Sequence, residues 1–307
     1  MAMTNYHEIP VNYTSFSSYI ENKNDILFDS LSKTDTKILF YDTCSFRYHS
    51  NLNEKERKAI VDYIKSKNFL LVFITTIVME LGQDSGIYES LYINYFKELY
   101  DAKVKLFFVK EEEFYDNAKI VFSSETIKSQ LKYGVLNIKR PNSVAEIAHE
   151  RYSDFFYSEK ENTSIVISSF FQDVRNTKEH EDDLGEQMIL LCVYLLSQIP
   201  PLYENRIYVF TDDKGAASLF QKAFKNLPNK CTYPRIFNII KIVEDLYITN
   251  QVVDKTKLKN IISSVYGTDN INIRVAREIL STIDTINLTV DELIEEITKK
   301  HSYNILL

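Results

Sequence analysis

Glycine is scarce in this chain, which has six glycines among 307 residues. A phosphate-binding loop needs closely spaced glycines so that backbone amides can approach the phosphate oxygens. Neither GxxxxGK followed by Ser or Thr nor GxGxxG occurs in the sequence. The composition therefore argues against nucleotide binding through a phosphate loop of either type.

Histidine is also sparse, and the five histidines show no zinc-ligand spacing. His149 is followed by Glu150, but the second histidine of the HExxH motif is missing. A Gly-x-Ser-x-Gly nucleophile elbow is absent as well. These gaps argue against a zinc peptidase and a serine hydrolase. The histidines are His7, His49, His149, His180 and His301.

The three cysteines, Cys44, Cys192 and Cys231, lie far apart and form neither a CxxC pair nor a disulfide framework. This pattern favours a reducing, cytoplasmic setting. No stretch approaches the roughly 20 consecutive apolar residues of a membrane-spanning helix. The first residues lack the basic and apolar regions of a signal peptide, so we expect neither secretion nor a membrane partner.

Positive charge is in deficit, because the formal net charge is −7. A protein that binds duplex DNA along its backbone is usually basic, so broad electrostatic capture of nucleic acid is not expected. An enzyme whose acids are concentrated in a metal site remains compatible, since bound cations invert the local field.

The first half of the chain alternates between strand and helix patterns. Ile38–Tyr41 reads as a buried strand, and Asn53–Lys67 has helical spacing with Asn53 as N-cap. Phe69–Thr75 predicts a second strand, and Thr76 is the expected N-cap of the next helix. This alternation predicts an α/β fold with a parallel sheet flanked by helices.

The rest of the chain is predicted to contain a helical insertion before the sheet resumes. The expected elements are a strand at 103–109, a helical block at 111–180 with a helix starting near Ser143, a helix at 183–198, a strand at 206–211, a helix at 216–224 and a strand at 235–243.

Three regions follow from these patterns. Residues 1–36 form a polar N-terminal extension with a short helix around 15–30. Residues 37–245 form the α/β domain with its helical insertion. Residues 246–307 form a small helical C-terminal extension, with a turn at Asp269-Asn270 and Thr289 as the N-cap of a helix over Asp291–Lys299.

Acidic residues stand at two early points of the alternation. Asp42 directly follows the first strand, where ligand sites of open α/β sheets lie. Glu80 lies near the start of the helix after the second strand. Each has a purely structural alternative, because Asp42 could cap a helix and a first-turn Glu80 favours the helix dipole.

Two further acidic segments come late. Asp183 and Glu186 share one face at the start of the apolar helix that contains Met188–Leu196. Asp212 and Asp213 follow the late strand, and Thr211 could donate its hydroxyl to a carboxylate. Again, helix capping explains each segment equally well.

The serial order of these acids resembles that of PIN-domain nucleases. The first acid follows the first strand, the second lies in the helix after the second strand, and the third begins a late helix. The last follows a strand that ends in Thr. The matching pieces are Tyr41-Asp42-Thr43, Thr75-Thr76-Ile77-Val78-Met79-Glu80-Leu81, Leu184-Gly185-Glu186-Gln187 and Val209-Phe210-Thr211-Asp212-Asp213, and the resemblance covers about residues 37–110 and 182–245.

The resemblance implies a metal-dependent endoribonuclease that uses Mg²⁺ or Mn²⁺ to hydrolyse single-stranded or structured RNA. Oxygen ligands select such hard cations, and without them the clustered carboxylates repel one another. The resemblance assigns metal binding and catalysis to Asp42, Glu80, Glu186 and Asp212, with Asp183 and Asp213 as neighbours able to take those roles and Thr43 and Thr211 in support.

Two other readings remain open. The chain could be a non-catalytic interaction protein on the same scaffold, with a protein partner or inhibitor on its helical insertion. A phosphatase with Asp42 as nucleophile is disfavoured, because Cys44 stands where a second aspartate is expected.

Several properties stay undetermined by the sequence. Similar domains act as toxins with antitoxins, in RNA processing and in defence; the length here favours an accessory or defence nuclease over a bare toxin. The oligomeric state is undetermined. Residues that could stack bases, or simply form solvated helix faces, are Arg47, Tyr48, Lys132, Tyr133, Lys139 and Arg140.

Overall fold

The computed structural model describes most of the chain. The described residues are 6–21, 23–31, 36–138, 143–157, 163–179, 183–199, 206–224, 234–267, 270–277, 282–299 and 303–306. Cys231 and Asp269, together with Lys139 and Arg140 among the proposed base-stacking residues, lie outside these ranges.

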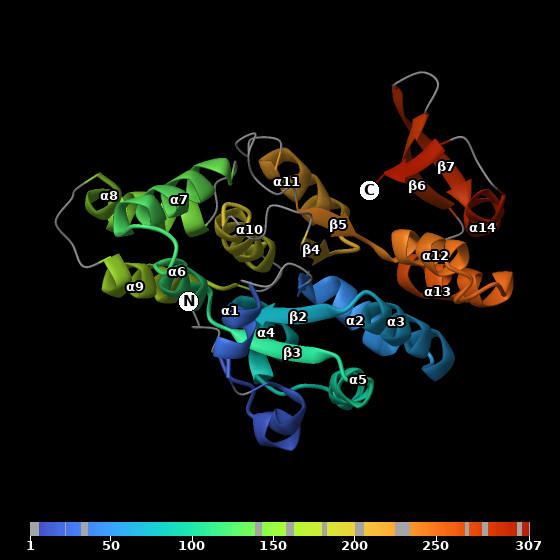
Figure 1. Cartoon of the computed structure of the whole chain (residues 1–307), viewed down its shortest axis with the longest axis horizontal. Helices are drawn as coiled ribbons and strands as arrows, with labels where there is room; N and C mark the ends of the chain where they lie inside the picture. The colour runs from blue at the N-terminus through green and yellow to red at the C-terminus, as the bar shows by residue number, and fades with distance from the viewer. Residues whose placement is uncertain are drawn as a thin grey trace.

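A five-stranded parallel sheet forms the centre of the molecule, in the order β3-β2-β1-β4-β5 (Figure 1). Its strands are buried on both faces, and this explains why they read as unbroken apolar runs. The chain runs from β1 outward through β2 and β3, then returns to β4 on the other side of β1. The strands are β1 Lys37–Tyr41, β2 Phe69–Ile74, β3 Lys105–Val109, β4 Ile207–Phe210 and β5 Arg235–Phe237.

Helices alternate with these strands, which confirms the predicted α/β class. They are α2 Thr43–Asn51, α3 Glu54–Ser66, α4 Thr75–Gly82 and α5 Ser90–Asp101. The Asn53 side chain accepts hydrogen bonds from two amides of α3, as expected of its N-cap. The prediction for Thr76 is wrong, because α4 begins one residue earlier and Ile74 is its N-cap. The Thr76 amide and hydroxyl instead donate to Glu111.

The predicted helical insertion is present and forms the group at the left of Figure 1. Its helices are α6 Glu111–Ala118, α7 Ser124–Asn137, α8 Ser143–Tyr157 and α9 Thr163–Arg175. Buried Arg175 pairs with Glu111 and Glu112 at 2.7 Å and so ties α9 to α6. The apolar helix α10, Leu184–Leu196, packs against α6 and α7, as its sequence suggests.

The N-terminal helix expected around residues 15–30 is broken. Two 3-10 turns, η1 Tyr13–Ser15 and η2 Ser17–Tyr19, precede the short helix α1, Asp25–Leu31. Phe16 lies between the turns, fully buried, with its ring stacked on Tyr88 and Phe96. Tertiary burial of this one ring accounts for the interruption.

The expected strand at 235–243 is largely wrong. β5 covers three residues, after which Asn238 caps α12, Ile239–Ile248, by accepting from the Lys241 amide. The apolar run after Phe237 therefore supplies the buried face of a helix, and a short apolar run cannot distinguish the two.

The C-terminal extension is not purely helical, which corrects the sequence prediction. Besides α13, Lys255–Tyr266, and α14, Val290–Thr298, it contains an antiparallel sheet in the order β7-β6-β8. Asn270-Ile-Asn-Ile-Arg-Val alternates polar and apolar residues, the pattern of a half-buried strand. Thr289 forms a capping box with Glu292, so its predicted N-cap role is confirmed. The strands are β6 Asn270–Arg277, β7 Thr282–Thr289 and β8 Tyr303–Leu306.

Within the described residues, no helix has the length and apolar character required to cross a membrane.

Candidate functional site

The carboxyl ends of β1 and β4 lie side by side and define the candidate site. Tyr41 pairs with Phe210 in register, and the Asp42 amide continues the ladder by donating to the Phe210 carbonyl at 3.0 Å. The residues that follow each strand therefore meet in the crevice between them. This is the point where the order of the sheet reverses and where open α/β sheets bind ligands.

Asp42 is buried at the bottom of this crevice, with 1% of its surface exposed. One carboxylate oxygen accepts from the Thr43 amide at 2.8 Å, and the other accepts from the Thr211 hydroxyl at 2.8 Å. Asp42 is thus the N-cap residue of α2, which is the structural role that its sequence position allowed. Thr211 contacts Asp42 through its hydroxyl, as the sequence suggested.

Glu80 reaches the same crevice from α4. Its carboxylate accepts from the Thr43 hydroxyl at 2.5 Å and from the Gly185 amide at 3.0 Å. Lys178, whose side chain is 4% exposed, pairs with it at 3.1 Å. Glu80 therefore connects α2, α4 and the start of α10, and a lysine already balances its charge.

Gly185 permits the close approach of α10 to Glu80. A Cβ at this position would lie 2.6 and 2.7 Å from the two Glu80 carboxylate oxygens and 2.8 Å from the Ile77 Cδ1. Any larger residue would force these groups apart. The Leu-Gly-Glu sequence at the start of α10 thus has a steric reason in this fold.

Glu186 follows directly and completes an electrostatic cluster with Asp42 and Glu80. Burial, together with the negative charges of Asp42 and Glu80, raises the pKa of Glu186 to about 9. Burial and the charge of Glu80 raise the pKa of Asp42 to about 7, although the hydrogen bonds from Thr211 and Thr43 oppose the rise. Three acids from separate segments therefore interact electrostatically.

Asp212 is held by structural contacts of its own. Its carboxylate accepts from the Ser45 hydroxyl and from the Ile239 amide, both at 2.8 Å, and its amide donates to Ser45 at 2.7 Å. The His49 ring nitrogen Nε2 lies 3.5 Å from the same carboxylate. Asp212 therefore joins the end of β4 to α2 and α12.

Asp213 is exposed and lies at the start of α11, Lys214–Phe224, which begins two residues earlier than predicted. Its amide donates to the Thr211 hydroxyl at 3.1 Å, and its carboxylate accepts from the Ala216 amide at 2.9 Å. Its negative charge contributes to the raised pKa of Asp42. Of the two adjacent aspartates, Asp213 is thus the one that is both accessible and electrostatically linked to Asp42.

A cavity of about 550 Å³ opens beside the cluster, between α10 and α11. Asp183 and Glu186 line it from α10, and Gly215 and Lys222 line it from α11. Asp183 is exposed and is the N-cap residue of α10, but its side chain does not cap the helix. Its charge adds to the rise in the pKa of Glu186.

The acidic side chains of the crevice do not surround a common point in this structure. Within the described part of the chain, no group of three or more His, Cys, Asp or Glu side chains is placed to hold a metal ion. Glu80 instead faces Lys178 and the Gly185 amide.

The sequence reading missed the partners that fix this arrangement. Lys178 lies at the end of a polar helical stretch and carries no motif. Ser45 and His49 follow Asp42 on α2, but only tertiary contact shows that they hold Asp212. Helical spacing from Asp42 was the one signal that could have indicated them.

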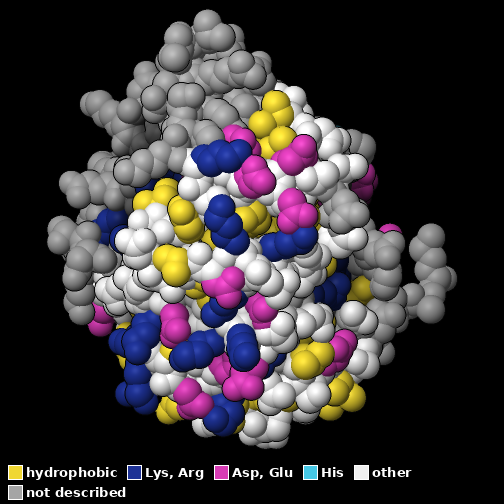
Figure 2. Space-filling model, turned by 90° about the vertical axis from the view of Figure 1, so that its right-hand side faces the viewer, with side chains coloured by type: hydrophobic (Ala, Val, Ile, Leu, Met, Phe, Trp, Pro, Cys, Tyr) yellow, Lys and Arg dark blue, Asp and Glu magenta, His cyan; other side chains and the backbone are white. Residues whose placement is uncertain are grey.

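Charge on the surface is mixed. On the face in Figure 2, Lys and Arg side chains intermingle with Asp and Glu. Of the residues proposed to stack bases, Tyr48 and Tyr133 are exposed, whereas Arg47 donates to the Glu80 carbonyl at 2.6 Å.

No family model, curated protein or solved structure matches this chain.

Proposed function

We propose that this protein is a metal-dependent endonuclease that hydrolyses phosphodiester bonds of RNA. One observation carries the proposal: acids from three distant segments meet at the carboxyl edge of the sheet. Thr43 donates its amide to Asp42 and its hydroxyl to Glu80, and the amide of Gly185, which precedes Glu186, also donates to Glu80. Buried carboxylates that repel one another destabilise a protein unless a cation or a proton balances them. A site that keeps them together is typical of divalent-cation binding.

The donor set suits Mg²⁺ or Mn²⁺, because its available ligands are carboxylate oxygens. Asp42 and Glu186 would hold the metal, with Glu80 joining them once its carboxylate leaves Lys178. A bound cation supplies a more acidic water and neutralises charge on the phosphate. Thr211 holds the Asp42 carboxylate in place through its hydroxyl.

We assign the fourth acid to Asp213 rather than to Asp212. Both Asp212 carboxylate oxygens accept hydrogen bonds inside the protein, whereas Asp213 is exposed and its charge acts on Asp42. Thr211 links the two functional acids, because its hydroxyl donates to Asp42 and accepts from the Asp213 amide.

A second candidate is a non-catalytic interaction protein on the same scaffold. The contact between Glu80 and Lys178 favours it, since this ion pair neutralises one acid without any metal. In that case the helices α6–α9 would offer the partner surface. Calorimetric titration with Mn²⁺ separates the candidates, because only the nuclease should take up the ion in a manner that depends on Asp42.

The test of the nuclease compares four variants for Mn²⁺-dependent cleavage of single-stranded RNA. Asp42→Asn and Asp213→Asn should lose more than about 100-fold in rate with native circular dichroism. Asp212→Asn should mainly lose stability, because an asparagine oxygen can accept only one of the two hydrogen bonds that Ser45 and Ile239 donate to Asp212. The control Asp245→Asn neutralises an acid that pairs with Lys67 away from the site and should cleave normally. Undiminished cleavage by Asp42→Asn would refute the assignment.

A further inference from the structure

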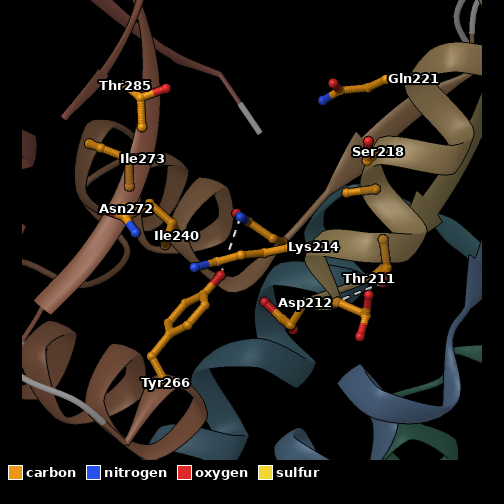
Figure 3. Close-up of a pocket in the computed structure, with 13 residues that line it drawn as sticks. Thr211, Asp212, Lys214, Ser218, Gln221, Ile240, Tyr266, Asn272, Ile273 and Thr285 are labelled. Carbon is orange, nitrogen blue, oxygen red and sulfur yellow. Dashed lines mark hydrogen bonds between the residues drawn. The ribbon is translucent and has the colours of Figure 1, made fainter. Parts of the chain in front are cut away.

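A second cavity, of about 290 Å³, is lined by Asp213 and shares Ser218 with the cavity lined by Glu186. Its walls come from the start of α11 on one side and from α12, α13 and the C-terminal sheet on the other (Figure 3). Thr211 and Asp212 line it at the acidic edge. The cavity thus adjoins the proposed site of hydrolysis, and four of its 13 lining residues, Tyr266, Asn272, Ile273 and Thr285, come from the C-terminal extension.

The polar groups in this cavity match the edge of a heterocyclic base. Asn272 and Gln221 bring side-chain amides, which offer both donors and acceptors, and Ser218 and Thr285 bring hydroxyls. Asn238 also lines the cavity, but its amide already accepts from the Lys241 amide and donates to Tyr266. Ile240 and Ile273 add apolar surface between them. A planar heterocyclic ring fits such a lining, because its rim can form hydrogen bonds with the polar side chains and its two faces can pack against the apolar ones.

Tyr266 stands at the junction between this cavity and the acids. Its hydroxyl accepts from the Asn238 amide nitrogen at 3.4 Å. Burial and the nearby charge of Asp212 hold the pKa of Tyr266 well above its ordinary value, so the phenol keeps its proton and can donate it. Its ring offers a face on which a base can stack.

Lys214 extends from the start of α11 across the cavity toward Tyr266, as Figure 3 shows. It is exposed, and it brings a positive charge next to Asp212 and Asp213. An RNA phosphate at this edge would otherwise meet only negative charge. Lys214 therefore offers the local compensation that the acidic net charge of the chain does not provide.

We propose that this cavity binds one unpaired nucleobase of the RNA substrate next to the bond that is cleaved. The proposal rests on the nuclease function proposed above and deepens it by naming a single-stranded substrate with a base preference at one position. A volume of about 290 Å³ lies at the lower end for small-molecule sites and suits a base rather than a duplex. Sequence-specific proteins read RNA bases in this way, by stacking and hydrogen bonds to splayed-out bases.

The C-terminal sheet is the element that would set the base preference. Asn272 and Thr285 enter the cavity from β6 and β7, which are not part of the parallel sheet that carries the acids. Cleavage and base selection are thus assigned to different parts of the chain, and substitutions can separate them.

The experiment titrates the four ribonucleoside 5′-monophosphates into the full chain without divalent cations, followed by NMR. One base should bind at least about fivefold more tightly than the weakest. Asn272→Ala should weaken that binding about fivefold to tenfold, which is the worth of one hydrogen bond. Asn287→Ala is the matched control, because Asn287 faces Asn272 across the β6–β7 pair, is exposed and does not line the cavity.

A second pair of variants tests the phenol. Tyr266→Phe should reduce the base preference. The control is Tyr247→Phe, which removes a hydroxyl that donates to the Thr298 carbonyl outside the cavity and should leave the base preference unchanged. A single-stranded oligoribonucleotide of the preferred base should displace the mononucleotide. Absence of displacement would overturn the RNA subsite in favour of a free nucleotide ligand.

The readouts separate this proposal from the nuclease proposal. Binding that is equal for all four bases, undetectable, or unaffected by Asn272→Ala would overturn the base subsite even if Asp42-dependent cleavage is observed. Base-selective binding that depends on Asn272 would support it even if Asp42→Asn cleaves like the native protein. In that second case only the assignment of hydrolysis to the Asp42 cluster fails.

Discussion

Replacement of Glu186 by glutamine should stabilise the metal-free protein at neutral pH. Burial and repulsion from Asp42 and Glu80 raise the pKa of Glu186 to about 9 from an ordinary 4.5. The folded state therefore takes up a proton that the unfolded state does not bind. At pH 7 this linkage costs the native protein about 3 kcal/mol of stability, at 1.36 kcal/mol per pH unit.

The sign of the pH dependence follows from the raised pKa. Below pH 4.5 the Glu186 carboxyl is neutral in both states, and the native protein bears no penalty. As the pH rises toward 9, the unfolded state releases the proton first, so stability falls over this interval. Glutamine does not titrate, so the advantage of Glu186→Gln should be absent near pH 4.5 and reach about 1–3 kcal/mol at pH 7 to 8, since Asp42 shares the same repulsion.

Urea denaturation at pH 5 and pH 8, in the presence of a chelator, measures this difference. The control is Glu125→Gln, which alters an exposed first-turn glutamate of α7 and should change stability by less than about 0.5 kcal/mol. Addition of Mn²⁺ should raise the melting temperature of the native protein more than that of Glu186→Gln. If the variant is no more stable than the native protein at pH 8, the reasoning about the buried cluster is wrong.

Two further predictions concern the scaffold. Gly185→Ala should destabilise the protein by about 1–3 kcal/mol, because the added Cβ would clash with the Glu80 carboxylate. In the control Gly82→Ala the added Cβ meets only contacts of 3.7 Å or more, so this variant should not be destabilised. Thermal melts compare the two variants. Thr289→Ala should cost about 1 kcal/mol in urea denaturation through loss of the capping box, and an unchanged midpoint would contradict that role.

The parallel sheet could be predicted from the sequence because its strands are buried on both faces. Ile38–Tyr41 and Phe69–Ile74 are short apolar runs separated by an amphipathic helix, and this alternation is typical of parallel sheets covered by helices. The C-terminal sheet was missed, although β6 alternates polar and apolar residues. Its partner β7 follows closely in the chain, but helical and strand patterns compete in segments this short.

The helix predicted in the N-terminal extension was wrong for a different reason. Residues 15–30 carry a weak helical pattern, but burial of Phe16 against Tyr88 and Phe96 outweighs that local preference. The helix propensity of a single residue contributes only a small free energy to folding, whereas the burial of a whole aromatic ring contributes more. Where the two conflict, tertiary packing decides.

The sequence by itself determined which acidic residues follow the strands of the parallel sheet and their order along the chain. Asp42 directly follows β1 and Thr211 directly follows β4. The carboxyl ends of parallel strands lie at the same edge of a sheet, so these two residues lie close together. Tertiary structure alone decided between neighbours that the sequence could not separate. Side-chain direction assigned Asp212 to Ser45 and the start of α12 and left Asp213 exposed beside Thr211.

The same holds for charge. The sequence shows a net charge of −7 but not where a compensating cation lies. Folding paired Lys178 with Glu80, directed Lys214 across the cavity toward Tyr266 (Figure 3), and raised the pKa values of Asp42 and Glu186. Burial and distance set these interactions, and both are properties of the folded chain rather than of its order of residues.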